Sequence, residues 1–211
     1  MKINITVLVS VLALGAPLFQ PQQAVAQAAK PASVVNLMDF RNQLSQLQND
    51  ISATVSSLNT VKECKKEADL PKAVKELGTR YTALEARVEE IRTNAIIVKA
   101  HVKAHFESWA KELTAMQSAS LREKAQDRLS RSQKEFEKII AEGVEAKEQV
   151  LPFVSEVKDI VIYLNADLSD DAVKTLSGNI WKLGNRSKSV IGSIGDVIEQ
   201  IDDTVKSLPQ T

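Results

Sequence analysis

The sequence predicts an all-α fold: an elongated, antiparallel four-helix bundle with coiled-coil character that follows a signal peptide. Apolar residues recur at alternating three- and four-residue spacing over four long stretches, the pattern that lines one face of a helix. Short turn segments separate the stretches, and short turns between long helices make the neighbours antiparallel. Only 4% of the 211 residues are aromatic and only 7 are glycine, so neither a β-sandwich nor a glycine-rich phosphate-binding fold is expected.

Residues 1–26 have the pattern of a signal peptide. Lys2 gives a positive start, Ile5 to Leu14 form an apolar run, and Ala24 to Ala26 match an A-x-A cleavage pattern before Gln27. The run is shorter than the roughly 20 residues that span a bilayer, and the sequence near the cleavage pattern offers no cysteine for a lipid anchor. The mature chain is therefore predicted to be exported, periplasmic or secreted, with residues 27–32 as a leader and 33–208 as one domain.

The first helix is expected from about Ser33 to about Glu67, and Pro71 is expected to begin the second, because proline fits the first turn of a helix. One polar residue, Thr54, fills a core position of the heptad. The apolar stripe consists of Leu37, Phe40, Leu44, Leu47, Ile51, Leu58 and Val61.

The second helix is expected from Pro71 to about Met116. Its stripe shifts by one position after His105, a stutter that locally straightens a coiled coil. The stripe comprises Val74, Leu77, Tyr81, Leu84, Val88, Ile91, Ala95, Val98 and Val102, then Phe106, Trp109, Leu113 and Met116.

The third helix is expected from Ser120 to about Leu164. Ser120 and Glu123 have the spacing of a capping box, and Pro152 should kink or split the helix because it lacks a backbone donor. Gly143 is a second interruption. The stripe comprises Leu129, Phe136, Ile139, Val150, Val154, Val157 and Val161.

The fourth helix is expected to begin with Ser169 as its N-cap and with Asp170 and Asp171 in the first turn, where the helix dipole favours acids. Gly184, Gly192 and Gly195 weaken it or let a neighbouring helix approach closely. The stripe comprises Val173, Leu176, Ile180, Leu183, Ser187, Val190, Ile194, Val197, Ile201, Thr204 and Leu208.

The charge balance argues against two classes of partner. Lys and Arg total 27, and so do Asp and Glu. A nucleic-acid-binding protein needs a basic surface, and electrostatic attachment to anionic lipid needs a basic cluster. Neither partner is expected, and no transmembrane segment is expected in the mature chain.

His101 and His105 are the only histidines, and their spacing of four residues could place two metal ligands on one helix face. Two ligands are too few for a closed zinc site, and neither histidine follows a glutamate at the spacing of a di-iron bundle. His105 occupies a core position, so it is interpreted as a half-buried polar residue that sets register. No metal ligand and no cofactor is predicted.

No catalytic constellation is predicted either, and the chain is not expected to be an enzyme. The acidic pairs at 89–90, 170–171 and 202–203 fall on solvated faces or at a helix start, whereas acid–base catalysis needs a dry pocket that shifts a pKa. Trp109 and Trp181 are assigned to core packing. Cys64 is the only cysteine, and it could be buried, free or paired with another chain.

From about Leu84 to about Ile201 the chain resembles a bacterial family of uncharacterised proteins, domain of unknown function 2959. The resemblance implies an exported, coiled-coil-like protein, and it offers no catalytic residues. Many relatives look like lipoproteins, whose anchoring cysteine this chain lacks. The resemblance is carried by Trp109, Glu112, Leu113, Ser120 to Arg122, Val150 to Phe153, Val161 to Leu168, Asp171 to Val173 and Leu176.

Two functional hypotheses remain from the sequence. In the first, the chain is a non-catalytic cell-envelope protein that binds another protein, or itself, through its helical faces. In the second, it is a periplasmic bundle that binds a metal or a small ligand, using the two histidines and the irregular region around Gly143 and Pro152. A pore-forming bundle is disfavoured because the mature chain has no apolar hairpin.

Overall fold

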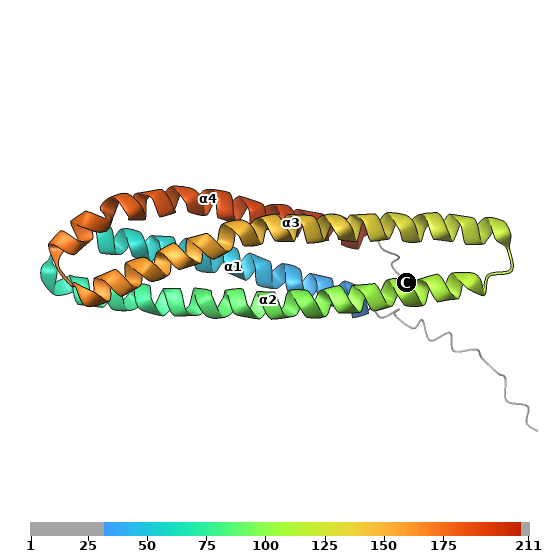
Figure 1. The fold of residues 1–211 in the computed structure, drawn as a ribbon, viewed down its shortest axis with the longest axis horizontal. Coiled ribbons are helices and arrows are strands. Elements are labelled where there is room, and N and C mark those ends of the chain that lie inside the picture. The colour runs from blue at the N-terminus through green and yellow to red at the C-terminus, as the bar shows by residue number, and fades with distance from the viewer. Residues whose placement is uncertain (1–31, 208–211) are drawn as a thin grey trace, which may run out of the picture.

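The computed structural model describes residues 32–207, which form four long helices (Figure 1). These are α1 (Ala32–Lys62), α2 (Leu70–Thr114), α3 (Ala119–Ala166) and α4 (Asp170–Ser207), with a 3-10 helix at Glu67–Asp69 before α2. The predicted signal peptide, residues 27–31 of the predicted leader and Leu208 lie outside the described residues, and Ala32, assigned to the leader, is the first residue of α1. None of the described helices is both long enough and apolar enough to cross a membrane.

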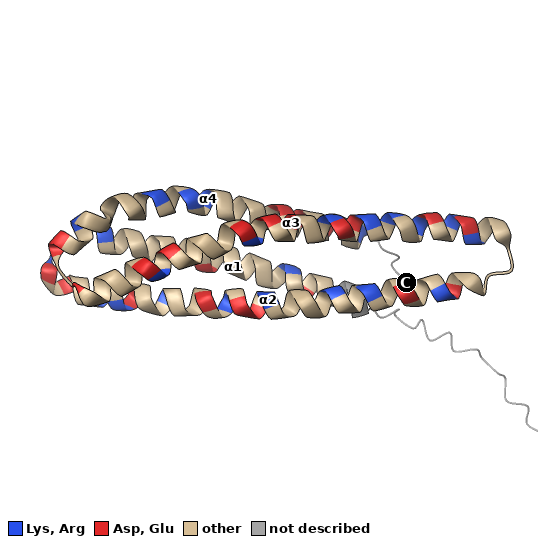
Figure 2. Cartoon of the chain, viewed as in Figure 1, with Lys and Arg blue, Asp and Glu red and all other residues tan. Residues whose placement is uncertain are grey.

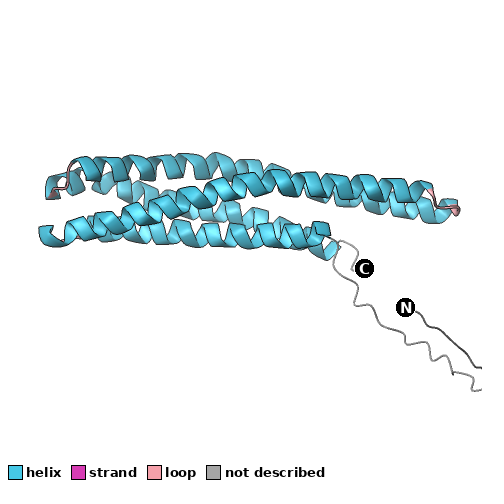
Figure 3. Ribbon diagram, turned by 90° about the horizontal axis from the view of Figure 1, so that it is seen from below, coloured by secondary structure: helices cyan, strands magenta, loops and turns pink. Residues whose placement is uncertain are grey.

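The helices form a ring in chain order. α1 packs on α2, α2 on α3, α3 on α4, and α4 returns to pack on α1. Every packed pair runs antiparallel (Figures 1 and 3), because successive helices are joined by one short turn and α4 is separated from α1 by three such turns. The predicted all-α, antiparallel four-helix bundle is confirmed.

The core lies along the predicted stripes, which are buried with few exceptions. Ala95 and Met116 are exposed, contrary to the prediction, and Phe153 is completely buried although the strict heptad of the third helix omits it. Met116 lies past Thr114, where α2 ends. Phe153 is buried because a bundle helix packs against two neighbours and buries a broader face than the narrow seam of a two-stranded coiled coil. The largest fully buried side chains are Phe153, Leu37, Ile51, Leu58, Leu70, Leu77, Leu84, Leu164, Ile180, Leu183, Ile194 and Ile201.

The prediction for the end of the first helix is wrong by five residues: α1 ends at Lys62 and not at Glu67. After Val61, the last buried residue of the helix, residues 62–69 offer no further apolar side chain for the core except the half-buried Cys64. The backbone becomes extended at Lys66 and then returns through the 3-10 turn. This path brings Leu70 into the core at the start of α2.

The capping box predicted at the start of the third helix is not formed. Ser118 is the N-cap residue and makes no capping bond with its side chain, so Ser120 lies inside the first turn. The helix also does not split at Pro152, because α3 is continuous to Ala166. Glu148, whose carbonyl would have accepted the missing bond, is exposed together with Pro152, so water can satisfy this carbonyl.

The predicted start of the fourth helix is confirmed. The backbone N–H of Ala172 donates to the Ser169 hydroxyl oxygen at 3.2 Å, and Asp170 and Asp171 occupy the first turn. The stripe of α4 includes two buried polar residues, Ser187 and Thr204. The hydroxyl groups of these two residues donate to carbonyl oxygens of their own helix, which satisfies the buried hydroxyl hydrogens locally.

Polar bonds join three of the four neighbouring helix pairs. Arg41 of α1 binds Asp202 of α4 through two nitrogens, at 3.1 and 3.2 Å. Arg87 of α2 binds Asp50 of α1 at 3.2 Å, and α4 bonds to α3 at three levels. Such half-exposed pairs contribute little to stability individually, but they fix how the helices are aligned along the rod.

Tyr81 provides a pH-dependent contribution to stability. Burial, and next the 2.6 Å hydrogen bond that its hydroxyl donates to Glu85, raise the pKa of Tyr81 from 10.0 to about 12. Because the unfolded chain loses this proton more readily, the contribution is complete below pH 10 and is lost as the pH rises from 10 to 12. At about 1.36 kcal/mol per pKa unit, the loss is at most about 2.7 kcal/mol.

We therefore expect the free energy of unfolding to fall over this range in the parent protein and to fall less in a Tyr81→Phe variant. Chemical unfolding at several alkaline pH values measures both. A Tyr163→Phe background leaves Tyr81 as the single tyrosine, so absorbance titration gives its pKa directly. Titration of this tyrosine near pH 10 would contradict the account.

Candidate interaction surface

At one end of the rod, α2 and α3 continue past the ends of α1 and α4 (Figures 1 and 3). The levels are fixed by two cross-helix bonds, from Asn36 of α1 to His101 of α2 at 2.7 Å and from Gln200 of α4 to Glu135 of α3 at 3.0 Å. α1 begins four residues before Asn36, whereas α2 continues 13 residues past His101. About nine residues of α2, roughly 13 Å, therefore have no neighbour in α1.

Comparison of α3 with α4 gives the same uncovered length as comparison of α2 with α1. α4 ends seven residues after Gln200, and α3 begins 16 residues before Glu135, so about nine residues of α3 also lie beyond α4. We call residues 106–128 the extension, and we call the place where α1 and α4 stop the step. Within the described residues, the extension is a two-helix hairpin on a four-helix rod.

The seven-residue repeat identifies which flank of α2 is uncovered in the extension. Arg87, Asn94 and His101, each seven residues apart, are the residues through which α2 bonds to α1. The same register continues to Ser108 and Ala115, beyond the start of α1. Both of these residues are exposed.

The corresponding flank of α3 carries an exposed apolar side chain. Glu156, Gln149 and Glu135 bond to α4 and share a seven-residue register. This register continues backward to Arg128 and Leu121. Leu121 is 58% exposed, and it lies where α4 would cover it if α4 were longer.

The extension has its own apolar seam. Leu113 is buried and Trp109 is half-buried, and Leu129 is buried one residue past the end of the extension. The rings of Phe106 and Phe136 meet edge to face with their centroids 6.1 Å apart. The hairpin is therefore held together along its seam, while its two flanks towards the step remain open.

Both signs of charge are interspersed on the extension, as they are along the whole rod (Figure 2). No electrostatic feature of the extension therefore selects a strongly acidic or a strongly basic partner. The basic residues are Lys111, Arg122, Lys124 and Arg128, and the acidic residues are Glu107, Glu112, Glu123 and Asp127.

The two histidines lie at the base of the extension. His101 is exposed and bonds to Asn36, and His105 is half-buried, with its ring centroid 6.0 Å from that of Phe106 and 6.2 Å from that of Trp109. Within residues 32–207, no group of three or more His, Cys, Asp or Glu side chains is arranged to hold a metal ion. That the pair does not bind a metal stays a prediction.

The half-buried position of His105 leads to a prediction about the melting temperature. Within the described residues no hydrogen bond to its ring is found, and a partly buried polar group without a partner costs roughly 1–3 kcal/mol. We expect a His105→Leu variant to melt at a higher temperature, as measured by circular dichroism. A lower melting temperature would mean that His105 has a specific partner.

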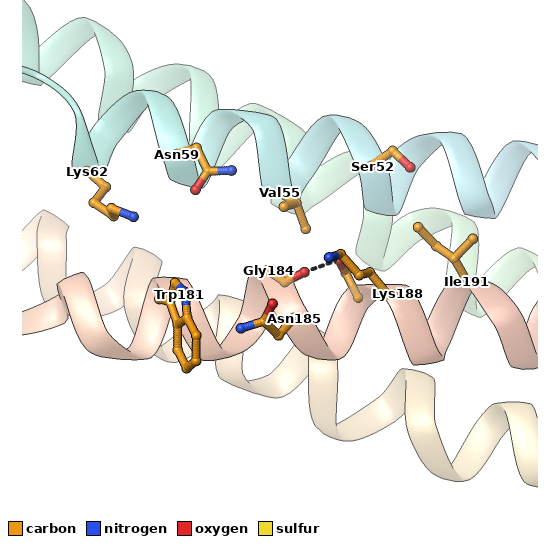
Figure 4. Close-up of a pocket in the computed structure, with 10 residues that line it drawn as sticks. Ser52, Val55, Asn59, Lys62, Trp181, Gly184, Asn185, Lys188 and Ile191 are labelled. Atoms are coloured by element: carbon orange, nitrogen blue, oxygen red, sulfur yellow. Dashed lines mark hydrogen bonds between the residues drawn. The ribbon is translucent and has the colours of Figure 1, made fainter.

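A shallow groove of about 420 Å³ runs along the α1–α4 seam (Figure 4). Gly184 lies at its floor opposite Val55, and the ammonium groups of Lys62 and Lys188 extend towards its middle from opposite ends. Neither lysine is ion-paired within the described residues. The other lining residues are Ser52, Asn59, Trp181, Asn185, Ser187 and Ile191.

Trp181 corrects one prediction from the sequence. It is 62% exposed and lies at the edge of the groove, so it does not pack in the core. It follows the fully buried Ile180, and one residue turns a helix by 100°, which carries the indole to the surface. Trp109, in contrast, does pack against the core.

The exposed apolar residues of α3 and the paired acidic residues do not indicate a functional site. Val144, Leu151 and Ile162 are exposed in line along α3, but polar residues separate them, and isolated apolar residues are normal on a surface. The paired acids are tied to basic neighbours: Asp171 binds Lys174, and Asp203 binds Lys206. The hydrogen bond that each lysine donates to its carboxylate raises the pKa of that lysine, which is the behaviour of solvated ion pairs.

The comparisons with known proteins give one result. The model of the family described as "Protein of unknown function (DUF2959)" matches residues 23–208. Comparison with curated proteins and with solved structures gives no match. The family match covers most of the chain and extends further in both directions than the resemblance seen in the sequence.

Proposed function

This chain belongs to the DUF2959 family of proteins of unknown function, and we propose from its geometry that it is a non-catalytic cell-envelope protein. The extension binds a protein partner, which is either another protein or a second copy of the chain. The single observation that carries the proposal is the step. Two helices with apolar stripes continue beyond the helices that cover them, and Leu121 is exposed on the flank so uncovered.

The proposal has support from chemistry and from the N-terminal sequence. An interface core needs an apolar contact surrounded by polar residues, and in the sequence Leu121 lies between the polar residues Ser120 and Arg122. The signal-peptide pattern of residues 1–26 supports the location in the envelope. N-terminal sequencing of the protein from its host should begin at Gln27, and a protein that begins at Met1 would contradict export by cleavage.

Site-specific photo-cross-linking in living cells tests the binding role. A photoreactive amino acid is placed at Leu121 or Ser108 on the open flanks, and at Ile96 as a matched control. Ile96 is exposed on α2 but lies in the four-helix part of the rod. We expect one discrete adduct from each flank position and none from Ile96.

The adducts must also depend on the flank chemistry. Arg128→Glu, a reversal of charge on the α3 flank, should reduce the adduct formed from Ser108, while Lys158→Glu on an exposed site of the four-helix part should not. Absence of any flank-specific adduct would overturn the proposed function.

The groove favours a second candidate function, the binding of a small anion. Two lysines without ion partners converge on one groove whose lining includes no acid, which is an environment that attracts negative charge. A methyl group at Gly184 would lie 3.9 Å from Val55, an ordinary contact, so Gly184→Leu should fill the groove without breaking the helix. Binding of citrate or phosphate that is the same in the parent, in Gly184→Leu and in Lys62→Gln would exclude this candidate.

A further inference from the structure

We propose that the partner on the open flanks is a second copy of this chain, whose extension fills the step so that the two molecules interlock end to end. The inference rests on the proposed function and names its partner. It starts from the shape of one copy: four helices over most of its length, then two helices for about nine residues. Two such ends, turned towards each other, are complementary.

The directions of the helices allow one symmetric arrangement in which the extension of each copy fills the step of the other. A two-fold axis perpendicular to the rod places α2 of the second copy in the position that α1 would occupy beside α2. The same axis places α3 of the second copy in the position of α4 beside α3. Two-fold symmetry makes both new pairs antiparallel, as the pairs α1–α2 and α3–α4 already are (Figure 1). The interlocked region is then a complete antiparallel four-helix bundle.

The exposed residues suit these positions. Ser108 and Ala115 on the α2 flank are small, so a facing helix can approach closely. Leu121 lies two residues from the middle of the uncovered part of α3, so the two-fold axis brings it near the Leu121 of the second copy and removes an exposed apolar side chain from water. The balanced charge of the extension means that two identical surfaces do not repel each other.

The size of the overlap sets the strength of the association. Two helix pairs of roughly 13 Å each bury less than the ~1,200 Å² of a standard stable interface. The dimer should therefore be weak, with association in the range of about 10 µM to 1 mM. A high local concentration of the protein would favour this dimer by mass action.

Symmetry provides a sharp test, because residues near the two-fold axis meet their own copies. Ser108 lies near the middle of the uncovered part of α2. In a Cys64→Ser background, Ser108→Cys should give a covalent dimer with a short bismaleimide. Ser155→Cys, exposed on α3 in the four-helix part, should not, although a monofunctional maleimide should label both cysteines equally.

Sedimentation equilibrium supplies the second readout without cross-linking. The parent protein should shift from monomer towards dimer as its concentration rises, and Leu121→Glu should weaken the association at least tenfold. Ile162→Glu, a matched change at an exposed position on the same helix, should leave it unchanged. A parent protein that is monomeric up to 1 mM, or a Leu121→Glu variant that associates as well as the parent, would overturn the inference.

The photo-cross-links from Leu121 in cells distinguish failure of the second-copy inference from failure of the proposed binding function. An adduct with twice the mass of the chain supports both. An adduct with a different protein keeps the function and overturns the second copy as the partner. A link within one chain, to a peptide outside residues 32–207, assigns the step to this chain's own terminus and overturns both.

Discussion

A Phe153→Ala variant should lose about 3–5 kcal/mol of its free energy of unfolding, the usual cost of removing a large buried aromatic side chain. Phe153 is completely inaccessible to solvent in the middle of the four-helix part. Its removal takes away apolar burial and leaves a cavity that the rigid helices around it cannot close. Urea unfolding followed by circular dichroism measures the loss.

Leu151→Ala is the matched control. Leu151 lies two residues away on the same helix and is 45% exposed, so its truncation should cost less than about 1 kcal/mol. If the two variants lost equal stability, α3 would be rotated relative to the structure, and the assignment of its covered and open faces would fail with it.

Amide hydrogens of the extension should exchange at least about 100-fold faster than those of the four-helix part, a difference of about 2.7 kcal/mol in local opening. Each helix of the extension packs on one neighbour, whereas each helix of the four-helix part packs on two. A two-helix hairpin of this length is marginal without further packing, so it should open without unfolding the rod. Exchange measured by mass spectrometry on dilute protein tests this.

The control for this experiment is the protein's own concentration. If a second copy fills the step, protection of residues 106–128 should rise as the concentration rises, while protection around Leu84 in the middle of α2 stays constant. Equal protection of both regions in dilute protein would mean that the flanks of the extension are already covered in the monomer.

Helix number, direction and most core residues follow from the sequence because they depend on local periodicity. The three- and four-residue spacing places Leu47, Leu77 and Ile194 in the core whatever the relative lengths of the helices. The start of α4 also follows from the sequence, because an N-cap serine followed by two acids is a local signal. Phe153 was missed because a strict heptad allows a narrower buried face than a bundle helix has.

The candidate site could not be predicted in the same way. The step depends on which residues of different helices lie at the same level, and this is fixed by cross-helix bonds such as Asn36 to His101. The sequence does not display such pairs. Leu121 was visible as an apolar residue near a helix start, but its significance appears only when α4 is seen to end before reaching it. The exposure of Trp181, in contrast, could be predicted from the sequence, because Trp181 follows Ile180 of the apolar stripe and one residue turns a helix by 100°.

The sequence suggests that the glycines of α4 let a neighbouring helix approach closely, and the structure supports this only in part. Gly184 and Gly195 do face α1, as a close approach requires, but an added methyl group would meet its nearest atoms at 3.9 and 3.6 Å. These are ordinary contacts, so neither glycine is required for packing. Replacement of Gly192, which has open space around it, is expected to be equally tolerated.

Small-angle scattering on dilute protein tests the central claim, an extended rod with an open two-helix end, most directly. The 48 residues of α3 span about 72 Å at 1.5 Å per residue, so the monomer should have a radius of gyration of about 20 Å or more. A compact domain of the same mass would have a value of about 16 Å. A monomer near 20 Å whose maximum dimension matches α3 supports the rod and its step. A monomer near 16 Å would mean that the helices fold back on themselves, and the open flanks proposed as the binding surface would not exist.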